Sequence, residues 1–250
     1  MMKQYKAQCF FCRPYDNQIH SRIEREIVDN EFTQRSVWGF RVHERRQEHL
    51  HAVYIEKQIV VEKIIDPFGN SSEFERISYS QVDFQLSVSP PHLIIFQPPR
   101  TYRKLISQLA HFVDYTIAIQ NKNVDLFSWA KSLENKGISG VVTKANIFPI
   151  TYDKMTSGKL SLVSGNDLRK KIQKLLSATS YTVKQIKIIF DDKIGIPAVE
   201  LFNNGKIVFS RPLNSENFKI FYETFYALTL SAEQSHSPDG KKRGGADANE

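Results

Sequence analysis

The sequence predicts an α+β fold with two units, each a mostly antiparallel sheet covered by helices. The chain of 250 residues is 41% hydrophobic and 24% charged, a composition typical of a folded protein with a full core. Segments whose apolar residues alternate are interleaved with segments whose apolar residues recur at helical spacing. A pattern of strand, proline and helix also occurs twice, 113 residues apart.

The repeated pattern suggests a divergent internal duplication. Phe96, Pro99, Leu105, Leu109 and Phe112 of the first copy align with Phe209, Pro212, Phe218, Tyr222 and Phe225 of the second. Because proline has no N–H for a strand ladder and disfavours the α conformation in the residue before it, each copy predicts a strand that stops before a helix. We therefore expect an N-terminal unit over residues 1–120 and a C-terminal unit over 121–230.

The N-terminal unit is expected to begin with a strand at residues 5–12. Isoleucines at helical spacing then predict a helix over 17–30. Alternating apolar residues on both sides of the charged tip 44–48 predict a long hairpin. The remaining expected elements are strands at Ile59–Ile65, Phe74–Tyr79, Val82–Val88 and Leu93–Phe96 and a helix at Thr101–Val113.

The C-terminal unit is expected to begin with a helix over 124–135, which Gly137 ends because glycine accepts the positive φ of a helix C-cap. Asn203, Asn204 and Gly205 between two apolar runs predict a tight hairpin turn for the same reason. The other expected elements are strands at Gly140–Ile150, Lys159–Val163, Tyr181–Phe190, Ala198–Phe202 and Lys206–Phe209 and helices at Asn166–Ser177 and Ser215–Leu230. The aromatic face of the last helix is expected in the core: Phe218, Phe221, Tyr222 and Phe225.

Residues 231–250 predict a disordered tail, because they include no large apolar residue and are rich in Gly, Ser and Ala. The four acidic and three basic residues of this tail sum to −1, so the +7 of the whole chain leaves about +8 on residues 1–230. We interpret the cluster of Lys241, Lys242 and Arg243 as solvated, with contact to an anionic partner as the alternative.

The apolar runs of the sequence are far shorter than the roughly 20 residues needed to cross a bilayer. The N-terminal residues lack the continuous apolar stretch of a secretory signal. Because the chain has two cysteines and no export signal, we expect a cytoplasmic protein without membrane contact.

Cys9 and Cys12 have the spacing of a redox or zinc motif. A second pair of ligands is missing from the sequence, and residues three apart on a strand face opposite sides. We interpret both cysteines as buried packing residues and expect neither a metal nor another cofactor.

Two groups of basic residues predict contact with nucleic-acid phosphates. Basic residues cover the non-apolar surface of the expected helix 166–177, and more lie on the next strand. This pattern would attract phosphates. The alternative is that these residues only form a solvated face. A second group lies where the expected helix 101–113 begins, beside its free N–H groups. The predicted binding residues are Arg100, Arg103, Lys104, Arg169, Lys170, Lys171, Lys174, Lys184 and Lys187.

Arg46 and His51 suggest an alternative chemistry. Their Arg-x4-His spacing resembles the motif of HEPN-type ribonucleases. The resemblance implies metal-independent RNA cleavage, in which the histidine assists proton transfer and the arginine stabilises the phosphate. It also implies a helical setting, whereas the flanks of this segment alternate with period two.

The sequence lacks the GxxxxGKS/T, GxSxG and HExxH motifs, which leaves nucleotide hydrolases, esterases and zinc proteases without support. We therefore expect a non-enzymatic accessory protein that binds DNA or RNA through a basic surface, within a larger assembly that includes a protein partner. A protein–protein adaptor that docks an acidic partner is the second hypothesis. A ribonuclease that uses Arg46 and His51 is the third.

Overall fold

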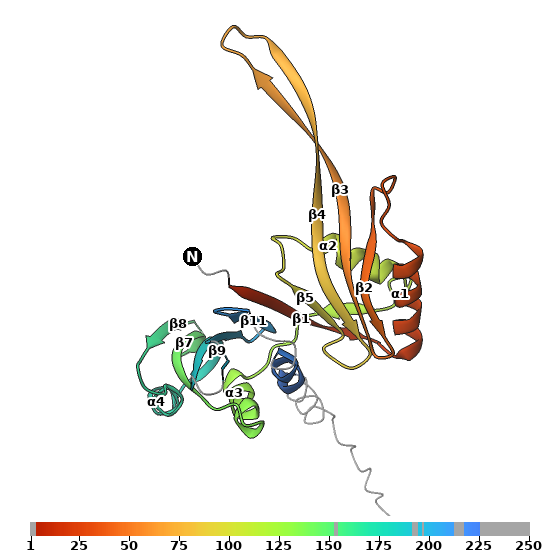
Figure 1. Ribbon diagram of the computed structural model, residues 1–250. Helices are drawn as coiled ribbons and strands as arrows, with labels where there is room; N and C mark the ends of the chain where they lie inside the picture. Colours follow the sequence, from red (N-terminus) through yellow and green to blue (C-terminus); the bar gives the residue numbers. More distant parts are fainter. Residues whose placement is uncertain (1–3, 153–154, 192–194, 197, 213–217, 226–250) are drawn as a thin grey trace, which may run out of the picture.

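A computed structural model describes residues 4–152, 155–191, 195–196, 198–212 and 218–225. The predicted tail 231–250 and residues 215–217 and 226–230 of the last predicted helix lie outside these residues. Within the described part, the fold is mixed α+β, with one sheet of eleven antiparallel strands (Figure 1). None of the described helices is long and apolar enough to span a membrane.

The strands follow the order β2-β3-β4-β5-β1-β11-β10-β9-β7-β8 across the sheet, and β6 pairs with β1. Their bounds are β1 (Tyr5–Arg13), β2 (Trp38–Arg46), β3 (His49–Ile65), β4 (Ser71–Ser87), β5 (Leu93–Phe96), β6 (Ala118–Gln120), β7 (Gly140–Thr151), β8 (Ser157–Val163), β9 (Ser180–Phe190), β10 (Val199–Phe202) and β11 (Lys206–Phe209). The helices are α1 (Asn17–Asp29), α2 (Arg103–His111), α3 (Leu126–Asn135) and α4 (Arg169–Leu175). Residues 218–225 are also helical and are called the last helix below.

Strand β1 joins two half-sheets, an N-terminal one (β2 to β5) and a C-terminal one (β7 to β11). Ala7 of β1 pairs with Phe96 of β5 on one side and with Ile207 of β11 on the other. Alternate residues of β1 enter different apolar clusters, because successive side chains of a strand point to opposite faces. Cys9 lies in the cluster formed with α3, α4 and the last helix, and Cys12 lies in the cluster formed with α1 and α2.

The two clusters place helices on opposite faces of the same sheet. Helices α1 and α2 cover the N-terminal half-sheet, whereas α3, α4 and the last helix cover the C-terminal half-sheet from the other side (Figure 1). As far as the described residues go, each half-sheet is therefore covered by helices on one face and open on the other. The open faces of the two half-sheets lie on opposite sides of the sheet.

The cysteine prediction is confirmed. Cys9 and Cys12 are both free and buried, and they point into different clusters. Burial raises the pKa of each thiol to about 12, so both are neutral packing groups.

The predicted internal duplication is not confirmed. Leu105 and Leu109 of α2 pack in the α1/α2 cluster, whereas Phe218 and Phe225 of the last helix pack in the cluster on the other face. The two strand-to-helix corners therefore lead to opposite sides of the sheet. Both corners do follow central strands that flank β1, which accounts for the apolar strand that their sequences share.

The predicted strands 59–65, 74–79 and 82–88 belong to two longer strands, β3 and β4. These strands pair continuously from His49 with Ser87 to Ile65 with Ser71. Beyond Glu56 they pair only with each other and form a projecting two-stranded arm (Figure 1). The arm carries exposed apolar side chains on both faces: Ile59, Val61, Ile64, Ile65, Phe68, Phe74 and Ile77.

The last helix is anchored to α3 by a buried tryptophan. Trp129 Nε1 donates to Thr224 Oγ1 at 3.0 Å and to the Phe221 carbonyl oxygen at 3.2 Å. Its ring lies 4.7 Å from that of Phe225. The predicted aromatic face is confirmed as core for Phe218, Phe221 and Phe225, while Tyr222 packs at its margin.

The predicted hairpin turn at residues 203–205 is confirmed. Gly205 has φ +82°, a conformation that favours glycine, and the Cys9 N–H donates to its carbonyl oxygen at 3.1 Å. A Cβ at this position would lie 2.9 Å from the Phe225 ring. The turn thus requires glycine both for its backbone and for close packing against β1 and the last helix.

Candidate functional site

The open face of the C-terminal half-sheet carries five lysines, here called the lysine face: Lys144, Lys159, Lys184, Lys187 and Lys206. Register places Lys144 opposite Lys187, and Ala145 opposite Ile186 in the next pair. Since Ala145 and Ile186 are core residues, the neighbouring lysines project from the other side. None of the five amines is paired with a carboxylate of the described residues.

A ladder of side-chain hydrogen bonds crosses four strands of this face. Ser161 Oγ on β8 donates to Asn146 Oδ1 on β7 at 2.7 Å. Asn146 Nδ2 donates to Gln185 Oε1 on β9 at 2.7 Å, and Gln185 Nε2 donates to Glu200 Oε2 on β10 at 2.8 Å. The ladder orients two amides and uses one N–H of each within the described residues, which leaves a second N–H on each amide for a ligand.

Two aromatic side chains flank the ladder. Phe148 and Phe202 line a depression of about 340 Å³ together with Asn146, Lys159, Lys184 and Gln185. Phe148 is half exposed, and Lys206 Nζ lies 4.9 Å from the centre of the Phe202 ring. The depression therefore combines apolar rings, amides and cations on a flat strand surface.

The predicted basic helix lies on the opposite side of the sheet from Lys184 and Lys187. Helix α4 packs Ile172 into the cluster that contains α3. Lys170, Lys171 and Lys174 are exposed on its outer surface. The structure thus separates the two parts of the predicted site, and phosphate binding by the α4 lysines stays a prediction.

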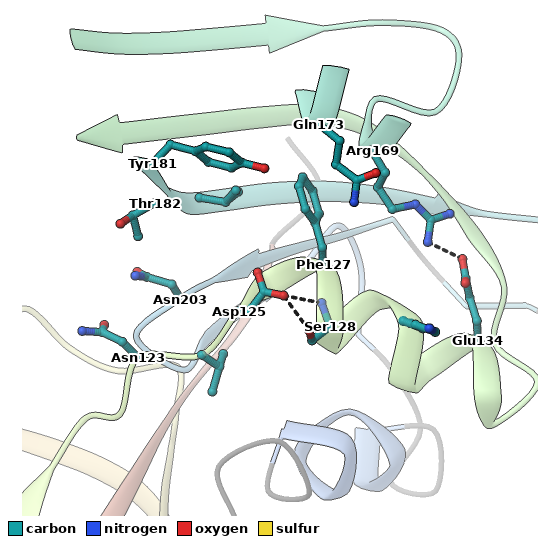
Figure 2. Close-up of a pocket in the computed structure, with 13 residues that line it drawn as sticks. Asn123, Asp125, Phe127, Ser128, Glu134, Arg169, Gln173, Tyr181, Thr182 and Asn203 are labelled. Carbon is teal, nitrogen blue, oxygen red and sulfur yellow. Dashed lines mark hydrogen bonds and ion pairs between the residues drawn. The ribbon is translucent and has the colours of Figure 1, made fainter. Parts of the chain in front are cut away.

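Arg169 is held by two carboxylates at one end of a pocket of about 660 Å³ between α3 and β9. Its guanidinium lies 2.5 Å from Glu134 and 2.6 Å from Asp167. Hydrogen bonding to Asp167, with a smaller contribution from Glu134, raises the pKa of Arg169 further above its usual value. Figure 2 shows Arg169 and Glu134 at one end of the pocket, with Asn123 and Asn203 at the other. Arg169 therefore lies at the end of this pocket with its charge balanced by two carboxylates, which makes it a weak phosphate contact.

The basic corner before α2 is also partly occupied. Lys104 forms an ion pair with Glu56 of β3, while Arg100 and Arg103 are exposed. Tyr102 packs edge-on against Phe10, with ring centres 5.6 Å apart. This corner lies on the same side of the sheet as the lysine face, and the exposed cations that it offers are Arg100 and Arg103.

The open face of the N-terminal half-sheet forms a second cavity, here called the histidine recess, of about 730 Å³. Strands β2, β3 and β4 form its floor, and residues of β1, β5 and the last helix form its wall. Its lining includes Tyr5, Glu44, Arg46, Glu48, His49, His51, Asp83, Phe96, Phe218, Lys219, Tyr222 and Glu223.

His51 is held in the recess by a carboxylate and an aromatic ring. His51 Nε2 lies 2.6 Å from Asp83 Oδ1, and the His51 ring packs edge-on against Phe96 at 5.7 Å. The hydrogen bond to Asp83 raises the pKa of His51, although burial acts in the opposite direction. Burial, together with the negative charge of Asp83, raises the pKa of Tyr5.

The Arg46/His51 pair of the sequence prediction does meet in this recess, but on antiparallel strands of a β-hairpin. Arg46 pairs in register with His49, and Glu44 pairs with His51. The helical setting of the HEPN-type motif is absent from this segment, so that resemblance is limited to the two residue types. Sequence reasoning missed Asp83, because it lies 32 positions from His51 in the chain.

No protein-family model matches the chain, and a search of curated proteins finds no similar sequence. The geometry of the two open faces is therefore the basis on which we infer function.

Proposed function

We propose that the chain binds single-stranded nucleic acid on the lysine face, as an accessory subunit of a larger assembly. One observation carries this proposal: five lysines without a paired carboxylate in the described residues, two aromatic rings and an oriented amide ladder share one open strand surface. Each component has a matching chemical group in an unpaired strand.

Lysine amines would bind the phosphates and release their counterions, a favourable change that is sensitive to salt. Phe148 and Phe202 would stack against bases, because every base has an apolar face when it is unpaired. The free N–H groups of Asn146 and Gln185 would donate to base edges. A flat sheet suits a splayed single strand better than a duplex, whose bases are already stacked.

Charge reversal tests this placement. We expect Lys184→Glu with Lys187→Glu to weaken binding of a fluorescein-labelled oligouridine roughly tenfold at low salt and to reduce the slope of log K against log salt by about 1.4. Fluorescence anisotropy measures both quantities. Lys170→Glu with Lys171→Glu on α4 is the matched control, since it makes the same charge change on the other side of the sheet.

The outcomes distinguish the two predicted basic surfaces. If only the α4 control loses affinity, the binding surface is α4 and the lysine face is excluded. If both variants bind oligouridine with the affinity of the parent, neither surface is the binding site.

The adaptor hypothesis requires the lysine face to dock an acidic protein. Binding of an acidic protein and binding of nucleic acid would both weaken when the lysines are substituted. Only the binding of nucleic acid would also depend on stacking against the aromatic rings. Competition between labelled oligouridine and polyglutamate distinguishes the two hypotheses. A site for an acidic protein would release the oligonucleotide when polyglutamate is added at a comparable concentration of negative charge.

Membership of an assembly is supported by the arm of β3 and β4. An isolated two-stranded ribbon has little core of its own, and this one exposes large apolar side chains such as Ile59, Phe74 and Ile77. Contact with an extended apolar strand of a partner protein would cover them. Deleting residues 59–64 and 72–77 removes paired positions and keeps the strand register. We expect this deletion to leave oligouridine affinity unchanged and to abolish co-purification of the native partner.

A further inference from the structure

We propose that the histidine recess is an acid–base site that cleaves RNA by transesterification, with His49 and His51 as the catalytic pair and Arg46 as the phosphate contact. This goes beyond binding on the lysine face, because the recess lies on the other side of the sheet and is built from different residues.

Strand geometry brings the two imidazoles together. His49 and His51 are two positions apart on β3, so their side chains project from the same face. Each faces a carboxylate: His51 Nε2 lies 2.6 Å from Asp83, and His49 Nε2 lies 3.9 Å from Glu44. A carboxylate partner orients an imidazole for proton transfer.

Arg46 places a cation beside this pair. It is the register partner of His49 across the hairpin and forms an ion pair with Glu44, while two thirds of its side chain remains exposed. The guanidinium can therefore contact a phosphate oxygen without leaving Glu44. Lys219 of the last helix faces the recess as well and is 3.6 Å from Glu223.

The remaining charges and rings define the substrate. Glu48 adds a negative charge at the hairpin tip, and His43 lies with its ring 5.4 Å from that of His51. Phe96, Phe218 and Tyr222 form an aromatic wall, with Phe218 5.7 Å from each of the other two. A nucleotide fits this combination, because its base can stack on the wall while its phosphate meets Arg46 and a protonated histidine.

The reaction is an isomerisation that consumes neither water nor an oxidant. His49 accepts the proton of the ribose 2′-hydroxyl, and the 2′ oxygen forms a bond to phosphorus. The P–O5′ bond breaks, and His51 donates its proton to the leaving 5′ oxygen. The products are a 2′,3′-cyclic phosphate and a 5′-hydroxyl, after which solvent returns one proton from His49 to His51. Asp83 is a positioning residue, because its hydrogen bond to His51 raises the pKa of that imidazole and so favours the protonated form that donates.

The test uses a short fluorescein-labelled DNA oligonucleotide with one central ribonucleotide, incubated with the full chain in EDTA. We expect cleavage on the 3′ side of that ribonucleotide, with a cyclic phosphate end. His51→Gln should lower the rate about 10²–10⁴-fold, the usual contribution of a general acid. His111→Gln, an exposed histidine of α2, is the matched control and should cleave like the parent.

Two further measurements separate catalysis from misfolding. Added imidazole should restore part of the activity of His51→Ala, because an imidazolium ion can occupy the space of the missing ring and donate the proton. Asp83→Asn should move the alkaline limb of the pH–rate profile to lower pH, since the hydrogen bond to Asp83 is what raises the pKa of His51.

The proposal is overturned if the parent does not cleave the oligonucleotide, if the all-DNA strand is cut equally, or if His51→Gln retains full activity. Oligouridine binding and cleavage of the ribonucleotide substrate are measured separately on the same protein. Binding without cleavage would refute the catalytic recess alone, and cleavage without lysine-dependent binding would refute the lysine face alone.

Discussion

The two half-sheets of this protein share one ladder of strands but present very different open faces. The C-terminal half-sheet exposes a flat surface of lysines, phenylalanines and oriented amides. The N-terminal half-sheet exposes histidines that are matched with carboxylates in a walled recess.

The last helix accounts for much of this difference. Phe218 contacts Tyr5, Phe96 and Phe209 with ring centres 5.7–6.1 Å apart, so the helix lies across the centre of the sheet and walls the N-terminal open face. On the other side of the sheet, α2 belongs to the N-terminal half and the lysine face has no helix upon it among the described residues. An uncovered sheet face suits a long flexible ligand, whereas a walled one holds a single group in place.

The largest effect is expected from a charge buried in either cluster. Leu109→Asp in the α1/α2 cluster and Phe225→Asp in the other cluster should each cost at least about 3–5 kcal/mol of unfolding free energy, since a packed side chain is lost and a carboxylate is buried. Because β1 contributes to both clusters, we expect one cooperative urea transition in each variant. Two separated transitions would show that the half-sheets fold independently.

A second prediction concerns pH and the N-terminal half-sheet. His92 accepts a hydrogen bond from the Cys12 N–H at 3.0 Å, and burial, with smaller contributions from the charges of Arg13 and His20, lowers its pKa from 6.5 to about 4. The unfolded chain therefore binds a proton as pH falls below 6.5, while the folded chain resists protonation until about 4. The free energy of unfolding should decrease on the order of 3 kcal/mol across this window.

Urea titrations between pH 7 and pH 4 measure this decrease. His92→Gln keeps an acceptor for the Cys12 N–H and should flatten the profile, whereas His111→Gln should leave it unchanged. His51 should act in the opposite sense, because a raised pKa gives stability that is present below pH 6.5 and is lost as pH rises through the folded value. A parent profile that does not change between pH 6.5 and pH 4 would contradict burial of a neutral His92.

The smallest expected effect concerns base stacking on the lysine face. Phe202→Leu keeps an apolar side chain but removes a stacking surface, and it should weaken oligouridine binding by about 1–3 kcal/mol without changing the salt slope. Anisotropy titrations at two salt concentrations measure affinity and slope together. Ile189→Val, a change at an exposed position on the same face of β9, is the control. A changed slope would mean that Phe202 acts through Lys206 rather than by stacking.

Most elements could be predicted from local patterns, because each depends on neighbours in sequence. The spacing of Ile23 and Ile27 predicts α1, and Gly205 with its two asparagines predicts the β10–β11 turn. The continuous arm was predicted as separate strands, because polar residues such as Ser80 and Gln81 interrupt the apolar alternation while the β3 partner maintains the pairing.

The two candidate sites depend on register, which the sequence does not reveal. The i, i+2 spacing of His49 and His51 places both on one face, and that part was open to prediction. Their partner Asp83 and the contact between Asn146 and Gln185 arise only when distant strands align. The sequence also does not reveal which side of the sheet each helix covers, which is why Lys184 and the α4 lysines were predicted as one surface.

The central position of β1 has a consequence for the order of events during synthesis. Tyr5 pairs with Phe209, so β1 has to wait for a partner strand that is synthesised about two hundred residues later. Contacts of such long sequence separation form slowly, because the intervening chain must be closed into a loop. Until β11 arrives, one edge of β1 is unpaired and can accept a strand from another molecule. A chain that ends before β11 would therefore expose an unpaired edge of its central strand, which favours aggregation.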